Sequence, residues 1–199
     1  MSGAMGGGDA VRILGIDPGS VVVGFGCLEI REVAAAGGGG GAVPLAHAAS
    51  NTVHRAAGAG AVRVVEAGAT RLGTTRTPVA DRLLNLQRAI AALIERVAAH
   101  ELALEEAFYG KSVASALRIG EARGVILAGA RDKGLEVHQF SPARIKRAVT
   151  GSGAASKDAV AELVARQLAL ATMPQPRDAT DALAAAYCRA QERRVPRLR

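Results

Sequence analysis

Short apolar runs alternate along the chain with longer stretches in which apolar residues recur every three or four positions. The short runs predict β-strands over residues 11–16, 21–30, 63–70, 102–107 and 135–140. A Pro-Gly pair separates the first two runs, so they are expected to form a hairpin. Gly24 and Gly26 in the second run predict a bulge or a close approach of another backbone.

The longer stretches predict helices. After Thr77-Pro78, apolar residues at positions 83, 86, 90, 93 and 97 form one face of an amphipathic helix. Further helices are expected over residues 112–133, 142–150, 156–168 and 177–191, with Ser141 and Ser156 as N-caps. Three strands followed by α, β, α, β and further helices predict an α/β fold, a mixed five-stranded sheet flanked by helices.

Low-complexity sequence sets the expected domain limits. Residues 1–10 are expected to be a disordered tail, and residues 192–199 a basic tail. Residues 32–62 are rich in Gly and Ala, with five consecutive glycines at 37–41, and cannot bury enough apolar surface to offset their ordering entropy. We therefore expect a single domain over residues 11–191 that carries a long insert.

Glycines also lie on one stripe of the helix expected over residues 112–133. Gly120 and Gly124 lie there together with Leu117, and small residues on a helix face favour close packing against another helix. That second helix could belong to this chain or to a second subunit.

Charge and composition narrow the class of partner. The chain of 199 residues has a net charge of +7, and residues 131–199 hold 13 basic but only 7 acidic side chains. This bias favours a polyanionic partner, although a solvated Arg-rich surface would give the same excess. No apolar run has the length of a membrane span and no signal peptide is recognisable, so we expect a cytoplasmic protein without a membrane partner.

The cysteines and histidines of the sequence do not have the spacing of a zinc site or of a redox pair. Cys27 and Cys188 are far apart in sequence and are expected to be reduced thiols in the core. The four histidines show no ligand spacing. Any metal site in this chain is therefore expected to rest on carboxylates.

Carboxylates follow predicted elements at three places. Asp17 ends the first strand, Glu105 and Glu106 end the fourth, and Asp178 and Asp181 lie one helical turn apart at the start of the last helix. Each place alone has a structural explanation, namely a turn-initiating Asp or an acid favoured by the helix dipole. Together they can converge on hard divalent cations such as Mg²⁺ or Mn²⁺, and two such ions can activate water against a phosphodiester.

The two adjacent acids cannot both belong to such a cluster. Successive side chains of a strand point to opposite faces of the sheet, so Glu105 and Glu106 face opposite sides. Periodicity does not decide between them.

Four motifs together resemble the RuvC family of bacterial Holliday junction resolvases. They are ILGIDPGS at residues 13–20, LEEAF at 104–108, SALRIGEARG at 115–124 and DATDAL at 178–183, in the order of the family. The resemblance implies an RNase H-like fold, a homodimer, and Mg²⁺-dependent cleavage of four-way DNA junctions that leaves 5′-phosphate ends. It also implies a role in recombination and repair, with a RuvA–RuvB branch-migration complex as partner.

The resemblance assigns site residues as well. The family's catalytic, metal-binding acids fall on Asp17, Glu105, Asp178 and Asp181, which favours Glu105 over Glu106. Its DNA contacts fall on Phe108, which matches a base-contacting aromatic residue, and on Lys146 and Lys157, which match two DNA-contacting lysines. Lys111 is expected to be a further phosphate contact.

Two departures from the family pattern affect these expectations. The insert over residues 32–62 is longer and richer in glycine than the usual connection, and Ser112 stands where an amide side chain is common. The second departure leaves the sequence preference of cleavage open.

Two other functions remain as alternatives. An actin-like ATPase also begins with a hairpin that carries an acid and a glycine, but 199 residues leave little room for its two domains and nucleotide cleft. A non-catalytic junction-binding protein would use the same acids as structural caps. Binding of ATP would identify the first alternative, and metal-independent junction binding without cleavage the second.

Overall fold

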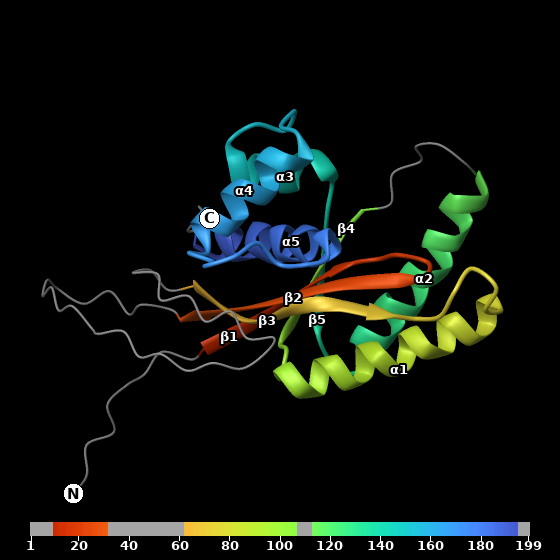
Figure 1. Ribbon diagram of the computed structural model, residues 1–199. Helices are drawn as coiled ribbons and strands as arrows, with labels where there is room; N and C mark the ends of the chain where they lie inside the picture. Colours follow the sequence, from red (N-terminus) through yellow and green to blue (C-terminus); the bar gives the residue numbers. More distant parts are fainter. Residues whose placement is uncertain (1–9, 32–61, 107–112, 195–199) are drawn as a thin grey trace, which may run out of the picture.

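The computed structural model describes residues 10–31, 62–106 and 113–194, which form one sheet with helices on both faces. Helix α5 covers one face of the sheet, α1 and α2 cover the other, and α3 and α4 lie beyond α5 (Figure 1). The expected mixed five-stranded sheet flanked by helices is confirmed. The element order is also as predicted.

The sheet contains one antiparallel half and one parallel half. Its strands are β1 (Ala10–Asp17), β2 (Val22–Arg31), β3 (Val62–Arg71), β4 (Glu101–Glu105) and β5 (Glu136–Phe140), in the spatial order β3-β2-β1-β4-β5. The tight turn after Asp17 makes β1 and β2 antiparallel, as β2 and β3 are. Strand β4 runs parallel to both β1 and β5, because helices connect these strands.

Two of the five helices that the structure describes begin at the N-caps that the sequence predicted, Ser141 and Ser156. The helices are α1 (Val79–Val97), α2 (Val113–Asp132), α3 (Pro142–Thr150), α4 (Lys157–Gln167) and α5 (Arg177–Arg194). The side chains of Ser141 and Ser156 accept hydrogen bonds from the amides of Arg144 and Ala159, which caps α3 and α4. Gly151 ends α3 with φ of 82°, a left-handed conformation that suits glycine.

Strand alternation divides the interior into two cores. Ile13 and Ala103 face α5, whereas Leu14, Leu102 and Leu104 face the α1–α2 layer. Both cysteines are buried and unbonded, as expected for core thiols. The alternation also determines on which face the residues at the strand ends lie.

Helix α5 lies unusually close to the sheet. A Cβ added to Gly15 would lie 2.0 Å from the carbonyl oxygen of Ala182, and one added to Gly24 would lie 2.2 Å from that of Asp178. The close backbone approach predicted at Gly24 is therefore confirmed, and β2 also has an irregularity between Cys27 and Leu28. These contacts set the first turn of α5 directly against β1 and β2.

Several elements extend past the limits predicted for them. Ala10 belongs to β1, where it pairs with Arg31, and Val62 belongs to β3, where it pairs with Ile30. Helix α5 extends to Arg194 rather than ending at residue 191, and the pairing of Arg193 with Glu101 holds its last turn on the sheet. In each case a tertiary contact extends the element past its local sequence signal.

The glycine stripe of α2 has no partner within the described part of this chain. Cβ atoms added to Gly120 and Gly124 would meet nothing within 4 Å, whereas Ala122, Ile126 and Ala130 on another face of the helix are buried. Leu117 is 64% exposed. Among the helices that the structure describes, none is long and apolar enough to cross a membrane.

Candidate active site

Two of the predicted acids end neighbouring parallel strands. Asp17 is the last residue of β1 and Glu105 the last of β4, and the pairing of these strands ends one residue earlier, at Ile16 with Leu104. The two acids are therefore next in register and, by alternation with Leu104, lie on the α5 face. Glu106 follows on the opposite side and is exposed. The geometry thus groups Glu105, and not Glu106, with Asp17.

The other two acids come from the first turn of α5. Asp178 and Asp181 lie one turn apart, and the close contact between Asp178 and Gly24 holds that turn beside the end of β1. Burial, followed by the charges of Asp181, Asp178 and Glu105, raises the pKa of Asp17 to about 7. Burial also raises the pKa of Glu105, with Asp181 contributing. The structure therefore brings all four acids together, while their catalytic role stays a prediction.

Two lysines from the outer helices reach this cluster. The ammonium Nζ of Lys157 lies 3.1 Å from Oδ2 of Asp181, and the charge of Asp181 raises the pKa of Lys157. Lys146 and Lys157 line a hollow of about 370 Å³ together with Glu105 and Asp181. Both lysines that the resemblance assigned to DNA thus lie at the acids. Phe108, Lys111 and Ser112 lie outside the described residues.

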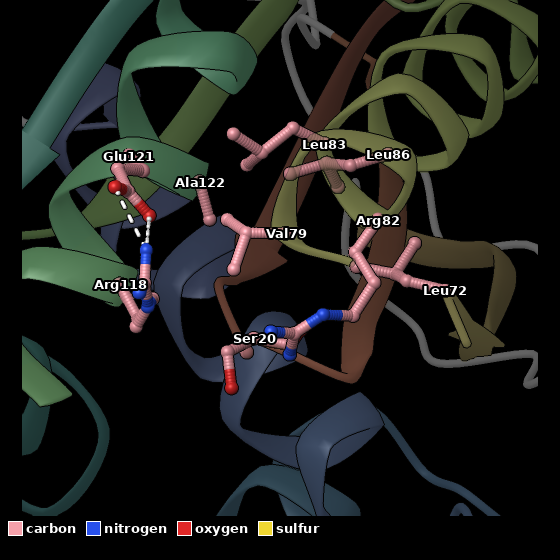
Figure 2. A pocket seen from close by; sticks show the side chains of 10 residues that line it. Ser20, Leu72, Val79, Arg82, Leu83, Leu86, Arg118, Glu121 and Ala122 are labelled. Carbon is pink, nitrogen blue, oxygen red and sulfur yellow. Dashed lines mark hydrogen bonds and ion pairs between the residues drawn. The ribbon is translucent and has the colours of Figure 1, made fainter. Parts of the chain in front are cut away.

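The turn that follows Asp17 is held from the opposite layer. Arg82 of α1 donates a hydrogen bond of 2.6 Å to the carbonyl oxygen of Ser20, and the amide of Leu72 donates one of 2.8 Å to Val21. Figure 2 shows Arg82 extending toward Ser20 across a hollow of about 240 Å³ between α1 and α2. Sequence reasoning missed Arg82, because a contact across 62 residues leaves no local signal.

The donor set of the cluster fits a hard divalent cation. All four side chains offer carboxylate oxygens, the ligands that Mg²⁺ and Mn²⁺ prefer. The raised pKa of Asp17 reflects burial first and then repulsion by the three neighbouring carboxylates, which Lys157 offsets only in part. A bound divalent cation would relieve that repulsion.

A different group lies at the other end of β4. Within the described ranges, Glu101, Glu136 and His138 form the one group of three whose potential ligand atoms all lie within 4.8 Å of one another. Arg189 donates to Glu101 at 2.8 Å, and Arg193 is also paired with it. Cationic side chains already neutralise Glu101, so this group is a poor cation site despite its spacing. No local sequence signal indicates that His138 joins two acids, because adjacent strands bring them together.

Comparison with known proteins places these features in a family. Residues 41–189 match the family described as crossover junction endodeoxyribonuclease RuvC, a range that includes Glu105, Asp178 and Asp181. The crossover junction endodeoxyribonuclease RuvC of Chloroflexus aurantiacus is 37% identical over 180 residues, which cover 90% of this chain and 93% of that relative.

Solved structures agree in fold. The Thermus thermophilus RuvC structure matches with a TM-score of 0.71 at 26% identity, covering 92% of this chain and 96% of that one. The yeast mitochondrial Holliday junction resolvase Ydc2 has a TM-score of 0.57 at 12% identity, covering 89% and 77% of the two chains, and supports the fold alone. The fold class is thus RNase H-like, as expected. By its sequence match and its relatives, this chain belongs to the RuvC family of crossover junction endodeoxyribonucleases.

Proposed function

We propose that this chain is an endonuclease that resolves Holliday junctions in recombination and repair, by Mg²⁺-dependent hydrolysis that leaves 5′-phosphate ends. One observation carries the proposal: Asp17 and Glu105 from two parallel strands meet Asp178 and Asp181 from α5. Membership of the RuvC family supports it. The fold alone would not, because one fold hosts many functions.

The four carboxylates are the proposed ligands of two Mg²⁺ ions per site, with Mn²⁺ as a substitute. The charges of the other three acids all act on Asp17, which is therefore the proposed bridging ligand. Bound ions of this kind generate a nucleophilic water at neutral pH and stabilise a leaving oxygen. The protein contributes by holding four carboxylates in place with few cations to neutralise them.

The lysines are proposed to bind phosphates of the junction. Lys146 and Lys157 line the hollow that Glu105 and Asp181 border, so a phosphate bound by them would lie next to the acids. Lys146→Ala is expected to weaken junction binding and to lower its salt dependence by about one counterion. Phe108 and Lys111 are proposed as a base contact and a phosphate contact from family resemblance alone.

A homodimer is the proposed working form. Val113 and Leu117 on α2 are 80% and 64% exposed, next to the open face of Gly120, and this apolar surface suits a second copy. An isologous dimer would present two identical sites, one for each strand to be cut. We further propose a cytoplasmic protein that acts with a RuvA–RuvB branch-migration complex.

A synthetic four-way junction tests the proposal directly. The full chain should cut it in symmetric pairs when Mg²⁺ is present, and Asp17→Asn should bind the junction without cutting it. Binding without cleavage under Mg²⁺ and Mn²⁺ would favour the non-catalytic junction binder instead. Saturable ATP binding without cleavage would favour the ATPase alternative.

A further inference from the structure

A buried arginine reaches the proposed site from the opposite face of the sheet. Arg123 of α2 is only 7% exposed, and its guanidinium donates hydrogen bonds to the main-chain oxygen of Glu105 and to Oε1 of Gln139, the latter at 2.6 Å. These acceptors lie at the carboxyl ends of β4 and β5. Arg123 therefore ties both strand ends to α2.

The two hydrogen-bond acceptors of Arg123 are neutral, whereas the other buried charges that the structure describes are held in ion pairs, although the charges of Glu106 and Glu105 also act on Arg123. Glu29 is paired with arginines, and Glu101 and Arg189 are paired with each other. Burial is the largest influence on the pKa of Arg123 and lowers it, and the charges of Glu106 and Glu105 offset this only in part. An apolar side chain of similar size would pack here without that desolvation cost. Packing alone is therefore a poor explanation of this residue.

The main-chain oxygen of Glu105, which Arg123 binds, lies where the pairing of β4 with β1 has ended. Ladder pairing between β1 and β4 ends at Leu104, so on that side Glu105 has no paired strand residue. On the other side it pairs with Phe140 of β5. Arg123 adds a charge-assisted hydrogen bond to the same peptide unit where the sheet ends. Fixing that peptide also fixes the direction of the Glu105 side chain on the opposite face.

We propose that Arg123 is a positioning residue that holds the Glu105 main chain, so that the Glu105 carboxylate stays beside Asp17 and the acids of α5. The residue touches neither substrate nor metal and acts only through Glu105. The inference rests on the proposed function, because it takes Glu105 to be a metal ligand. Its consequence is that Arg123 sets the affinity of the site for a divalent cation.

Manganese binding by the full chain tests this inference without relying on activity. Arg123→Met should weaken Mn²⁺ binding, measured by titration calorimetry, by roughly 10-fold or more, as losses of outer-shell partners do. Its affinity for a four-way junction in EDTA should stay at the wild-type value, and raising Mn²⁺ should restore part of the lost cleavage. A purely structural residue would lower the melting temperature and leave the Mn²⁺ affinity unchanged.

The same helix offers a matched control. Arg131 donates a hydrogen bond of 3.0 Å to the main-chain oxygen of Leu135, far from the acids. Arg131 is exposed, so Arg131→Met removes an arginine–carbonyl bond at the surface of the same helix and should leave both Mn²⁺ affinity and cleavage unchanged. Arg123→Lys keeps the charge but not the planar fork, so its Mn²⁺ affinity should fall between those of Arg123→Met and wild type.

The outcomes separate this inference from the proposed function. Wild-type protein that cuts junctions, together with an Arg123→Met variant of unchanged Mn²⁺ affinity, would overturn the positioning role alone. Wild-type protein that neither binds Mn²⁺ nor cuts would overturn both. If Arg123→Met does not fold, Arg123→Lys and Gln139→Ala replace it. Weaker Mn²⁺ binding in these variants supports the role, and wild-type affinity in both overturns it.

Discussion

The two ends of strand β4 carry acids in opposite electrostatic settings. At the amino end, burial alone would raise the pKa of Glu101, but Arg189 and Arg193 hold it below its usual value. At the carboxyl end, burial raises the pKa of Glu105, and the neighbouring Asp17 titrates at about 7. Arginines of the protein neutralise Glu101 at the first end, whereas Lys157 neutralises the four acids at the second end only in part.

The spacing of potential ligand atoms alone therefore does not identify a metal site. The Glu101 group has the closer ligand atoms, yet its charge is already matched by arginines. The Asp17 group is more loosely spaced, and among the described residues Lys157 forms an ion pair with it, through Asp181. Uncompensated charge, rather than proximity, points to the carboxyl end as the functional one.

The largest expected effect is on the rate of cleavage, when an acid at the carboxyl end of β4 is replaced. Glu105→Gln should lower the single-turnover rate of junction cleavage by roughly 1,000-fold, because loss of a metal ligand removes several kcal/mol of transition-state stabilisation. Glu106→Gln is the matched control, since Glu106 is exposed and lies on the other side of the strand. Equal losses in both variants would contradict the assignment of Glu105.

Replacing the acid at the amino end of β4 should instead lower the stability of the fold. Glu101→Ala leaves Arg189, which is 6% exposed, without its main partner, and should lower the free energy of unfolding by about 3 kcal/mol. Urea denaturation measures this loss. Cleavage per folded molecule should stay within about twofold of wild type. A rate loss like that of Glu105→Gln would mean that both ends serve the reaction.

The pH dependence of stability provides a third contrast. Asp17 has a pKa of about 7 in the folded state and an ordinary pKa of 3.8, so between these values the native state binds more protons than the unfolded state. The stability of the metal-free chain should therefore fall as pH rises from about 4 to about 7. Asp17→Asn should remove this fall and be about 2 kcal/mol more stable than wild type at pH 8 in EDTA.

Saturating Mg²⁺ is the control for that measurement. It should bring the wild type close to Asp17→Asn in stability, because the ion neutralises the same charge. If Asp17→Asn followed the wild-type stability curve at every pH, Asp17 would not be the acid whose raised pKa lowers the stability.

The smallest expected effect concerns the outer partner of Glu101. Arg193 is 25% exposed, so Arg193→Ala should cost only about 1 kcal/mol in unfolding free energy, measured in the same urea experiment. A loss as large as that of Glu101→Ala would place the main compensation on Arg193 rather than on Arg189.

Local chemistry made much of the fold and site predictable. The Pro-Gly turn after Asp17, the caps at Ser141 and Ser156, and the acids at element ends are all short-range signals, and the elements follow them. Strand periodicity left Glu105 and Glu106 undecided, and only the family resemblance favoured Glu105, because the answer depends on which face of β4 meets α5. That face is set by packing across the whole sheet.

Long-range contacts could not be predicted. Arg189 meets Glu101 across 88 residues, and Arg123 reaches the Glu105 carbonyl through the sheet. In neither case does the spacing of residues carry information about the partner. The electrostatic contrast between the two ends of β4 therefore emerges only from the structure.

The most direct test of this contrast is the position of bound manganese. Crystals of the full chain soaked in Mn²⁺ would locate the ion by its anomalous scattering. We predict peaks among Asp17, Glu105, Asp178 and Asp181, and none at the group of Glu101, Glu136 and His138. Manganese at the Glu101 group, with none among the four acids, would contradict the account.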